Sequence, residues 1–399
     1  MSLKRIAAVT ATAAALALSS LSGASAQETL KLGISAPMSG AAASWGLGFE
    51  WAAQQAADKI NAEGGIKVGG KSYNLEILTY DNKYNATEGA KVAQTLLNRD
   101  NVNYIVGSLG TAPVRALQAL SERKGVLLFT TAWGKSVKGP EFPLTFTQIN
   151  TPFEVLPQLY GYIKQQHPDA KSVVLISPND ATGQDTEKPA VATWKSLGVE
   201  VLSSDWYERG TTEFQPIATK IASLNPDIVD FSAAPPTDAG AILKELSVLG
   251  WKGIKSVSAG TSSSALVKTA GDSAEGVYMG LAADYDGPSA TPIQRELNEG
   301  ARKALGEPLN VITIGTWDAI MALKAAAETA DSLDPKVIAE TLPKIVFESS
   351  YGPTAFGGAD TYGNPQQMLL PTIVTQVQGG KVVEVKRVNP PELDKRLKN

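Results

Sequence analysis

Short apolar runs typical of strands alternate with amphipathic runs typical of helices along the first third of this chain of 399 residues. The strand-like runs cover 29–35, 73–81, 103–109 and 126–131. The helix-like runs between them cover 45–60, 86–98 and 111–125. Alternation of this kind builds a parallel sheet with helices on both faces, because each strand must cross over before it can pair in parallel with the next.

The same alternation restarts near Asn150. Strand-like runs follow at 172–177, 199–207, 227–232 and 254–259, with helix-like runs at 153–166, 185–197, 213–224 and 238–249. The sequence therefore predicts an α/β protein with two doubly wound parallel-sheet lobes, and places the first boundary at 148–151.

The last third of the chain has a different pattern. Helix-like runs at 292–305, 312–329 and 335–342 are followed by the Gly-rich stretch YGPTAFGGADTYGNP (351–365). Two alternating apolar runs then flank Gln378-Gly379-Gly380 within 368–388. Paired alternating runs around glycines are typical of a β-hairpin, which we expect here.

The N-terminus has the features of a secretory signal peptide. Lys4 and Arg5 precede an Ala/Leu/Val-rich run at 6–21, and Ala24-Ser25-Ala26 is a small-residue cleavage site. We expect residues 1–26 to be removed and the product to be periplasmic. The formal net charge of −4 becomes −6 without Lys4 and Arg5, and no basic stripe is visible. Binding to nucleic acid is therefore not expected.

Signals of catalysis are sparse. The chain has no Cys, and its single histidine, His167, lies beside Pro168 in a predicted surface loop. Thiol catalysis and thiolate metal sites are thus excluded, and a Ser-His-Asp triad would need His167. Asp284 and Asp286 form an acidic pair that is best interpreted as a solvated loop. We expect no enzyme activity, no cofactor and no metal site. A secreted hydrolase with two facing carboxylates remains an alternative.

Three strand-to-helix turns are the best candidates for a binding site, because ligands of doubly wound sheets collect at the carboxyl ends of the strands. One turn, PMSGAAASWG (37–46), ends in the aromatic ring of Trp45. A second, SLGTAP (108–113), contains Leu109, Gly110 and Thr111. A third, TTAWG (130–134), contains Thr131, Ala132 and Trp133. A plain helix cap and a core ring are the competing interpretations of Thr111 and Trp133.

The chain resembles the periplasmic leucine/isoleucine/valine-binding protein family, the extracellular receptors of ABC importers. The resemblance covers nearly all of the chain after the signal and rests on the order and spacing of several segments. These are KLGISAPMSGAAASWG, AADKINAEGGI, LTYDN, NYIVGSLGTAP, DATGQD, ILKELSVLGWKG and GDSAEGVY. It implies two lobes joined by three crossovers, with lobe 1 at 28–149 plus 279–353 and lobe 2 at 150–278 plus 354–399.

The resemblance also implies roles for particular residues. Trp45 would line the ligand, and Thr111 with the neighbouring backbone N–H groups would hold the ligand carboxylate. Residues 132–134 match the second binding loop of the family. The chain departs from the family in lobe 2, at the positions of two aromatic residues and of the acid that pairs with the ligand ammonium. It has Thr182-Gly183, Pro235-Pro236 and Ala259-Gly260 there.

These departures suggest that the carboxylate half of the site is kept and the amino half is lost, since an unpaired buried ammonium would cost several kcal/mol. We therefore expect a small aromatic carboxylate as ligand. The resemblance implies permease and ATPase subunits of an ABC importer as partners and a monomeric receptor. Asp180 or Asp238 could instead supply the counter-charge, which keeps a branched-chain amino acid, an amide or urea as alternatives. A further alternative for the class of protein is the sensor domain of a signalling receptor.

Overall fold

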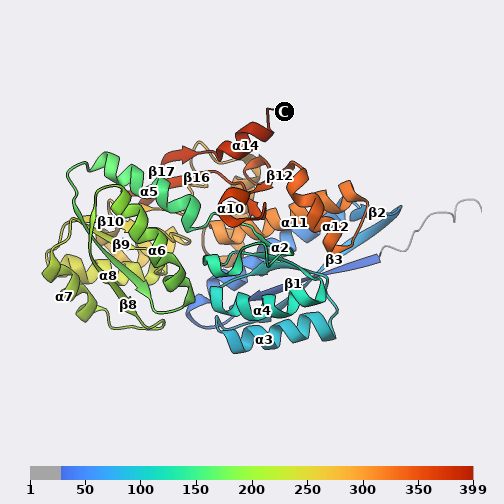
Figure 1. Cartoon of the computed structure of the whole chain (residues 1–399), viewed down its shortest axis with the longest axis horizontal. Coiled ribbons are helices and arrows are strands. Elements are labelled where there is room, and N and C mark those ends of the chain that lie inside the picture. The colour runs from blue at the N-terminus through green and yellow to red at the C-terminus, as the bar shows by residue number, and fades with distance from the viewer. Residues whose placement is uncertain (1–27, 399) are drawn as a thin grey trace, which may run out of the picture.

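The computed structural model describes residues 28–398, and within them the chain forms two α/β lobes that lie side by side (Figure 1). The predicted signal peptide lies outside the described residues. No helix among residues 28–398 is long and apolar enough to span a membrane.

The first lobe is built on an eight-stranded sheet. Its strands are β1 (Glu28–Ala36), β2 (Ile66–Val68), β3 (Lys71–Asp81), β4 (Tyr104–Ser108), β5 (Leu127–Thr130), β6 (Thr145–Thr147), β14 (Phe356–Gly357) and β15 (Gln367–Met368). Within the described residues their order is β14-β15-β6-β5-β4-β1-β3-β2. The pairs β3/β1, β1/β4, β4/β5 and β5/β6 are parallel, whereas β2 and β14 are antiparallel to their neighbours. The parallel sheet predicted from the alternation is therefore confirmed.

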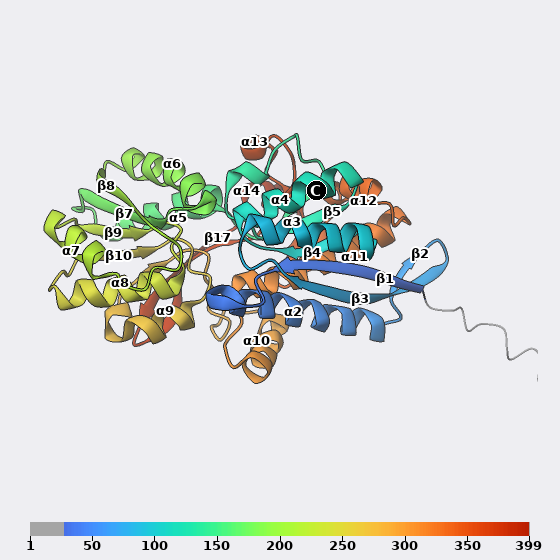
Figure 2. The ribbon, with the colours of Figure 1, turned by 90° about the horizontal axis from the view of Figure 1, so that it is seen from below.

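Helices cover both faces of this sheet (Figure 2). One face carries α2 (Ala43–Ala62) and α11 (Val311–Ala330), and the other carries α3 (Ala86–Gln94) and α4 (Thr111–Lys124). Alternate residues of β4 show the division, because side chains of a strand point to opposite faces. Tyr104 and Val106 belong to the core under α2 and α11, and Ile105 belongs to the core under α3 and α4.

The second lobe is built on a seven-stranded sheet in the order β17-β16-β11-β10-β9-β7-β8, counted within residues 28–398. Its strands are β7 (Ser172–Pro178), β8 (Glu200–Tyr207), β9 (Ile228–Phe231), β10 (Ile254–Val257), β11 (Tyr278–Met279), β16 (Thr372–Gln378) and β17 (Lys381–Val388). The helices on one face are α5 (Pro152–Gln166) and α6 (Ala181–Ser196), and on the other α7 (Gln215–Leu224), α8 (Pro236–Val248) and α9 (Ser263–Ala270).

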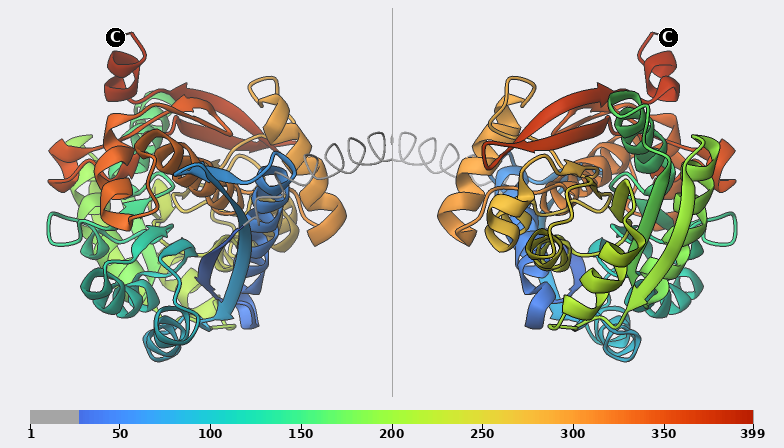
Figure 3. Two further views of the ribbon diagram at one scale, coloured as in Figure 1. Left: turned by 90° about the vertical axis from the view of Figure 1, so that its right-hand side faces the viewer. Right: turned by 90° about the vertical axis from the view of Figure 1, so that its left-hand side faces the viewer.

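Strands β16 and β17 form the predicted antiparallel hairpin, which runs along the edge of the molecule in Figure 3. Gln378 pairs with Lys381, and the two turn residues, Gly379 and Gly380, have φ values of +58° and +72°. Positive φ at both central positions is the geometry of the tight turn that suits hairpins, and glycine adopts it without strain.

The chain crosses between the two sheets three times. The first crossing joins β6 to α5 at 148–151. The second follows β11, after which α10 (Pro292–Leu305), α11 and α12 (Pro335–Thr341) pack with the first lobe. The third lies at 369–371, between β15 and β16, and so falls later than the boundary at 354 expected from the sequence.

The later crossing has a packing reason. The Gly-rich stretch (351–365) does not pass directly to the second lobe. It supplies β13 (Gly352–Thr354), which pairs with β12 (Phe347–Ser349), and then β14, and with β15 just after it β14 extends the first sheet. Phe356 there packs edge-on against Phe146, with ring centroids 5.1 Å apart. The C-terminal helix α14 (Pro391–Arg396) also returns to this lobe, where Leu393 packs with Ala355 and Leu369.

Candidate ligand-binding pocket between the lobes

A pocket with about 460 Å³ of empty space, part of it open to solvent, lies between the two lobes. The first lobe contributes the turns after β1, β3, β4 and β5, and the second contributes the segments after β7, β8, β9, β10 and β11. The lining residues are Trp45, Tyr84, Leu109, Gly110, Thr131, Trp133, Ile149, Thr182, Arg209, Ala233, Ala234, Pro235, Ala259, Thr261, Leu281 and Ile312. The site thus sits where the carboxyl ends of the strands of both sheets meet, as expected for doubly wound folds.

Trp45 lies in the first turn of α2 at the border of the pocket, partly exposed. The small residues beside it are explained by the tightness of the turn. A Cβ atom at Gly46 would lie 2.1 Å from the carbonyl oxygen of Pro37, so only glycine fits there. The Trp45 ring faces Tyr84, with centroids 6.2 Å apart and planes at 45°. The two rings form an aromatic wall on the side of the first lobe.

Arg209 of the second lobe reaches across to this wall. Its guanidinium carbon lies 4.6 Å from the centroid of the Tyr84 ring, and its Nε donates to Asp180 Oδ2 at 2.6 Å. Burial opposes the charge, but Tyr84 and Asp180 together raise the pKa of the Arg209 guanidinium above its usual value. Among the described residues that line the pocket, Arg209 alone carries a charge.

Asp180 is the N-cap of α6 and does not line the pocket. Its Oδ1 accepts hydrogen bonds from the N–H groups of Thr182 and Gly183, each at 3.0 Å, while Oδ2 is bound to Arg209. Both oxygens are therefore occupied by protein donors. Asp180 thus fixes the position of Arg209 and lies outside the lining that a ligand ammonium would meet.

Asp238 is engaged in the same way. Its Oδ2 accepts a hydrogen bond from Tyr207 Oη at 2.8 Å, and burial raises the pKa of its carboxyl group. Asp238 does not line the pocket either. The described lining therefore has no carboxylate, so the arrangement suits an anion better than a zwitterion or a cation.

Thr111 lies beside the pocket rather than in its lining. It is fully buried, its Oγ1 lies 2.9 Å from Thr182 Oγ1, and it accepts the N–H of Gly134 at 3.3 Å. Its own N–H donates to Thr182 Oγ1 at 3.4 Å. The resemblance assigns the hydroxyl and N–H of Thr111 to a ligand carboxylate. In this structure both are paired with the hydroxyl of Thr182 in the opposite lobe.

Two other candidates also fall outside the lining. Ala132 is buried in the core under α3 and α4, and its carbonyl oxygen accepts a hydrogen bond from Lys138 Nζ at 2.9 Å, which fixes the loop that carries Trp133. Gly260 donates its N–H to the carbonyl oxygen of Gly280 at 3.0 Å. A Cβ atom at residue 260 would lie 2.5 Å from that oxygen. The glycine therefore allows the backbone at Gly260 to approach the backbone at Gly280.

The structure therefore brings together seven of the eleven candidates in one lining. They are Trp45, Leu109, Gly110, Thr131, Trp133, Thr182 and Pro235. Sequence reasoning missed Tyr84 and Arg209 as site residues. A signal existed for both, because each lies just beyond the end of a predicted strand, in the segments YDNKYN and WYERG.

The residues considered for catalysis lie elsewhere. His167 Nε2 lies 3.0 Å from Tyr278 Oη, away from the pocket lining, and Asp286 is paired with Arg302 and Asn298. No group of three or more His, Cys, Asp or Glu residues within the described part of the chain could hold a metal ion. The facing carboxylates that a hydrolase would need are not found in the lining of this pocket.

The sequence profile of the periplasmic binding protein family matches residues 29–381, and the chain belongs to this family. A leucine-, isoleucine-, valine-, threonine- and alanine-binding protein of Pseudomonas aeruginosa is 22% identical over 332 residues, which cover 83% of this chain and 86% of the relative.

Two solved structures show the same fold. A leucine-binding protein from Thermotoga maritima has a TM-score of 0.78 at 20% identity, over 91% of this chain and 100% of its own. An ABC-transporter solute-binding protein from R. palustris in complex with benzoate has a TM-score of 0.77 at 17% identity, over 91% and 97% of the two chains. The chain is thus a solute-binding protein of the ABC-transporter type.

Proposed function

We propose that this protein captures an aromatic monocarboxylate in the periplasm and delivers it to the permease and ATPase subunits of an ABC importer. The observation that carries the proposal is the composition of the pocket lining, which combines three aromatic side chains with one guanidinium and no carboxylate. The aromatic residues are Trp45, Tyr84 and Trp133. Flat rings match the faces of an aromatic ligand, and the guanidinium matches its carboxylate.

The role of the guanidinium modifies the expectation from sequence. Because Thr111 is paired with Thr182, Arg209 is the group best placed to bind a carboxylate. Its Nε is used by Asp180, and the planar guanidinium has further N–H donors for a ligand anion. Desolvation in the apolar pocket strengthens such a charge-assisted bond.

The comparison with the benzoate-bound solute-binding protein supports this ligand class, and the leucine-binding relatives support the alternative of a branched-chain amino acid. The engagement of Asp180 and Asp238 by protein donors favours the aromatic acid, because the ammonium of an amino acid would have no carboxylate partner in the lining. A buried ammonium without a partner costs several kcal/mol.

Closure of the lobes would report occupancy to the membrane partners. Thr111 contacts Thr182, and Ser136 N–H of the first lobe donates to Asp185 Oδ2 of the second at 3.0 Å. These contacts exist only when the lobes are together. A ligand that bridges Trp45 and Arg209 adds to them and shifts the population toward the closed form.

The test is a binding screen with mature protein, residues 27–399, after unfolding and refolding to remove any bound solute. Isothermal titration against benzoate, 4-hydroxybenzoate, coumarate, leucine, valine and urea gives the ligand class directly. Binding of aromatic acids without binding of leucine or valine supports the proposal. Binding of leucine or valine alone would overturn it and require a carboxylate that moves into the pocket.

A further inference from the structure

Two polar atoms in the pocket lining have no hydrogen-bond partner within the described protein. They are Trp133 Nε1 and Thr261 Oγ1, and each residue is only 6% exposed. Trp133 comes from the first lobe, in the turn after β5, and Thr261 from the second lobe, after β10. A buried donor left unpaired costs roughly 1–3 kcal/mol, so a partner from outside the chain is expected.

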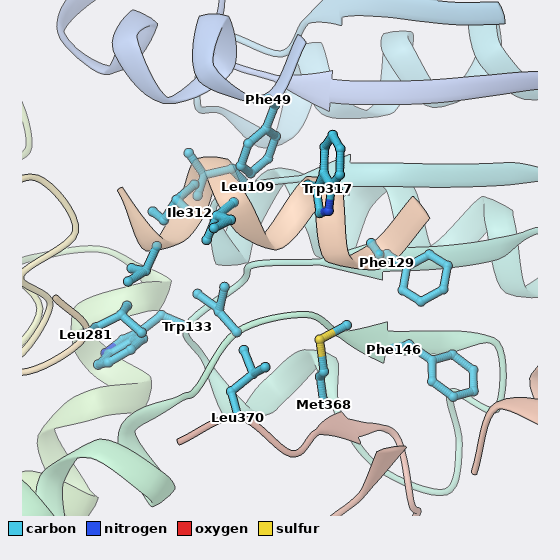
Figure 4. Close-up of a cluster of buried hydrophobic side chains, with 14 of the residues drawn as sticks. Phe49, Leu109, Phe129, Trp133, Phe146, Leu281, Ile312, Trp317, Met368 and Leu370 are labelled. Carbon is cyan, nitrogen blue, oxygen red and sulfur yellow. The ribbon is translucent and has the colours of Figure 1, made fainter. Parts of the chain in front are cut away.

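Both residues belong to the inner part of the pocket. Thr261 follows Gly260, whose N–H is bonded to Gly280 at the second crossing between the lobes. Leu281, next along that crossing, lines both this pocket and the smaller cavity at the hinge. Figure 4 shows Trp133 and Leu281 at the end of the buried cluster that faces the second lobe.

The charged part of the pocket is more exposed. Trp45, Tyr84 and Arg209 are all partly exposed, whereas Trp133, Thr261 and Leu281 are buried. The pocket thus has an outer part with the guanidinium and an inner part with two neutral, unpaired polar atoms. The walls between them, such as Ile312 and Ala234, are apolar.

The chemistry of the two atoms defines what they can bind. The indole Nε1–H is a donor only, whereas the threonine hydroxyl can donate or accept. A phenolic hydroxyl can accept from the indole and bond with the threonine at the same time. A carbonyl oxygen can accept from both. A hydrogen or methyl group at that position would leave both atoms unpaired.

We propose that the ligand carries an oxygen substituent, a hydroxyl or carbonyl, at the end away from its carboxylate, and that Trp133 Nε1 and Thr261 Oγ1 bind this oxygen. The two residues then determine specificity for oxygenated over unsubstituted aromatic acids. This inference rests on the proposed function, because it takes the carboxylate to be bound at Arg209.

The inner subsite, formed by Trp133 Nε1 and Thr261 Oγ1, is shared by the two lobes, and this affects the selectivity for the ligand. An oxygen bound by Trp133 and Thr261 bridges the first lobe and the second close to the hinge. Two neutral hydrogen bonds, each with a net value of about 0.5–1.5 kcal/mol, together correspond to about 5- to 140-fold in affinity. We therefore expect 4-hydroxybenzoate to bind at least about 5-fold more tightly than benzoate.

The experiment is isothermal titration of benzoate and 4-hydroxybenzoate into the refolded wild-type chain and into Trp133→Phe, Thr261→Val and Thr261→Ser. Trp133→Phe keeps an aromatic ring and removes the N–H, and Thr261→Ser keeps the hydroxyl. The expected result is a preference for 4-hydroxybenzoate in the wild type and in Thr261→Ser. The ratio of the affinities for 4-hydroxybenzoate and benzoate, taken within each protein, should shrink several-fold in Trp133→Phe and Thr261→Val, whatever change each variant makes to benzoate binding itself.

The outcomes separate the two proposals. Equal affinity of the wild type for both acids overturns the inner subsite and leaves the proposed function standing. A preference that survives in both Trp133→Phe and Thr261→Val also overturns it. If neither acid binds the wild type while leucine or valine does, the proposed function fails, and the inference fails with it.

Discussion

The guanidinium carbon of Arg209 lies 4.6 Å from the centre of the Tyr84 ring, and this contact joins the second lobe to the first at the outer part of the pocket. Tyr84 follows β3, and Arg209 follows β8, so the two residues are brought together only when both sheets have formed and the lobes meet. The contact places the one positive charge of the lining between Asp180 and an aromatic wall.

Replacing this charge is the most direct test of the ligand's anionic group. Arg209→Gln should weaken binding of benzoate about 10- to 100-fold, because hydrogen bonds to charged groups contribute about 1.5–3 kcal/mol. Isothermal titration measures the loss. Arg209→Lys keeps the charge but loses the planar stack on Tyr84. Its affinity for benzoate should lie between those of the wild type and Arg209→Gln. Unchanged affinity in Arg209→Gln would place the anion elsewhere, with the Thr111 turn as the next candidate.

Trp45 offers a test of the aromatic wall. Trp45→Ala should reduce affinity for benzoate by a few-fold to about 10-fold, since an aromatic pair is worth about 0.5–1.5 kcal/mol beyond its buried area. Trp45→Phe should retain most of the affinity. The matched control is Trp251→Ala, because Trp251 is also partly buried but bonds Pro226 in the second lobe, outside the pocket lining. An equal loss in both alanine variants would count against a direct role for Trp45.

Gly134 is the position at which closure can be blocked without touching the ligand. A Cβ atom there would lie 2.4 Å from Asp185 Oδ2 across the lobes and 2.8 Å from Thr111 Cγ2. Its φ of −73° is allowed for alanine, so the backbone is not strained, although the added methyl group must displace Thr111 within the first lobe as well as Asp185 across the lobes. We expect weaker ligand binding and, by small-angle X-ray scattering, a radius of gyration that no longer decreases when ligand is added.

The control for that experiment is Gly161→Ala. Gly161 lies within α5, and a Cβ atom there would meet nothing within 4 Å. This variant should bind ligand as the wild type does and gain about 0.5–1 kcal/mol of stability, because alanine favours the helix. A normal decrease of the radius of gyration in Gly134→Ala would show that the contact with Asp185 relaxes at little cost.

Asp318 on α11 predicts how stability depends on pH. It is fully buried, its Oδ2 accepts the hydroxyl of Ser350 at 2.8 Å, and burial raises its pKa from 3.8 to about 7. The folded state therefore binds a proton at the Asp318 carboxyl more tightly than the unfolded state does. As pH falls through about 7, the carboxyl becomes neutral, and the free-energy cost of burying its charge is relieved. The wild type should therefore gain stability relative to Asp318→Asn between pH 8.5 and pH 5.5.

Urea unfolding of both proteins at the two pH values measures that difference. Subtracting the Asp318→Asn curve removes the contributions of the other titrating groups, which both proteins share. A difference in free energy of unfolding that is the same at both pH values would mean that the Asp318 carboxyl titrates alike in the folded and unfolded chain.

The regular elements could be predicted because apolar periodicity and turn residues are local signals. The first crossing and the β16–β17 hairpin follow from such signals. The family was identified through the resemblance of segments such as NYIVGSLGTAP and DATGQD. The strands β14 and β15 are only two residues long, so they carry no period, and the last lobe boundary was placed too early. Arg209 and Tyr84 each follow a predicted strand, but they were missed because a contact across two lobes leaves no pattern along the chain that pairs them. The pairing of Thr111 with Thr182 is hidden for the same reason.

Neither sheet is made from a continuous stretch of chain. The first needs β14 and β15, and the second needs β16 and β17, so both lack edge strands until the segment beyond Tyr351 is available. A growing chain that ends before this point exposes unpaired strand edges and uncovered apolar surface in both halves. The two lobes should therefore become stable together, late in synthesis, and a nascent chain should remain loosely folded until the segment beyond Tyr351, roughly the last eighth of the chain, has emerged.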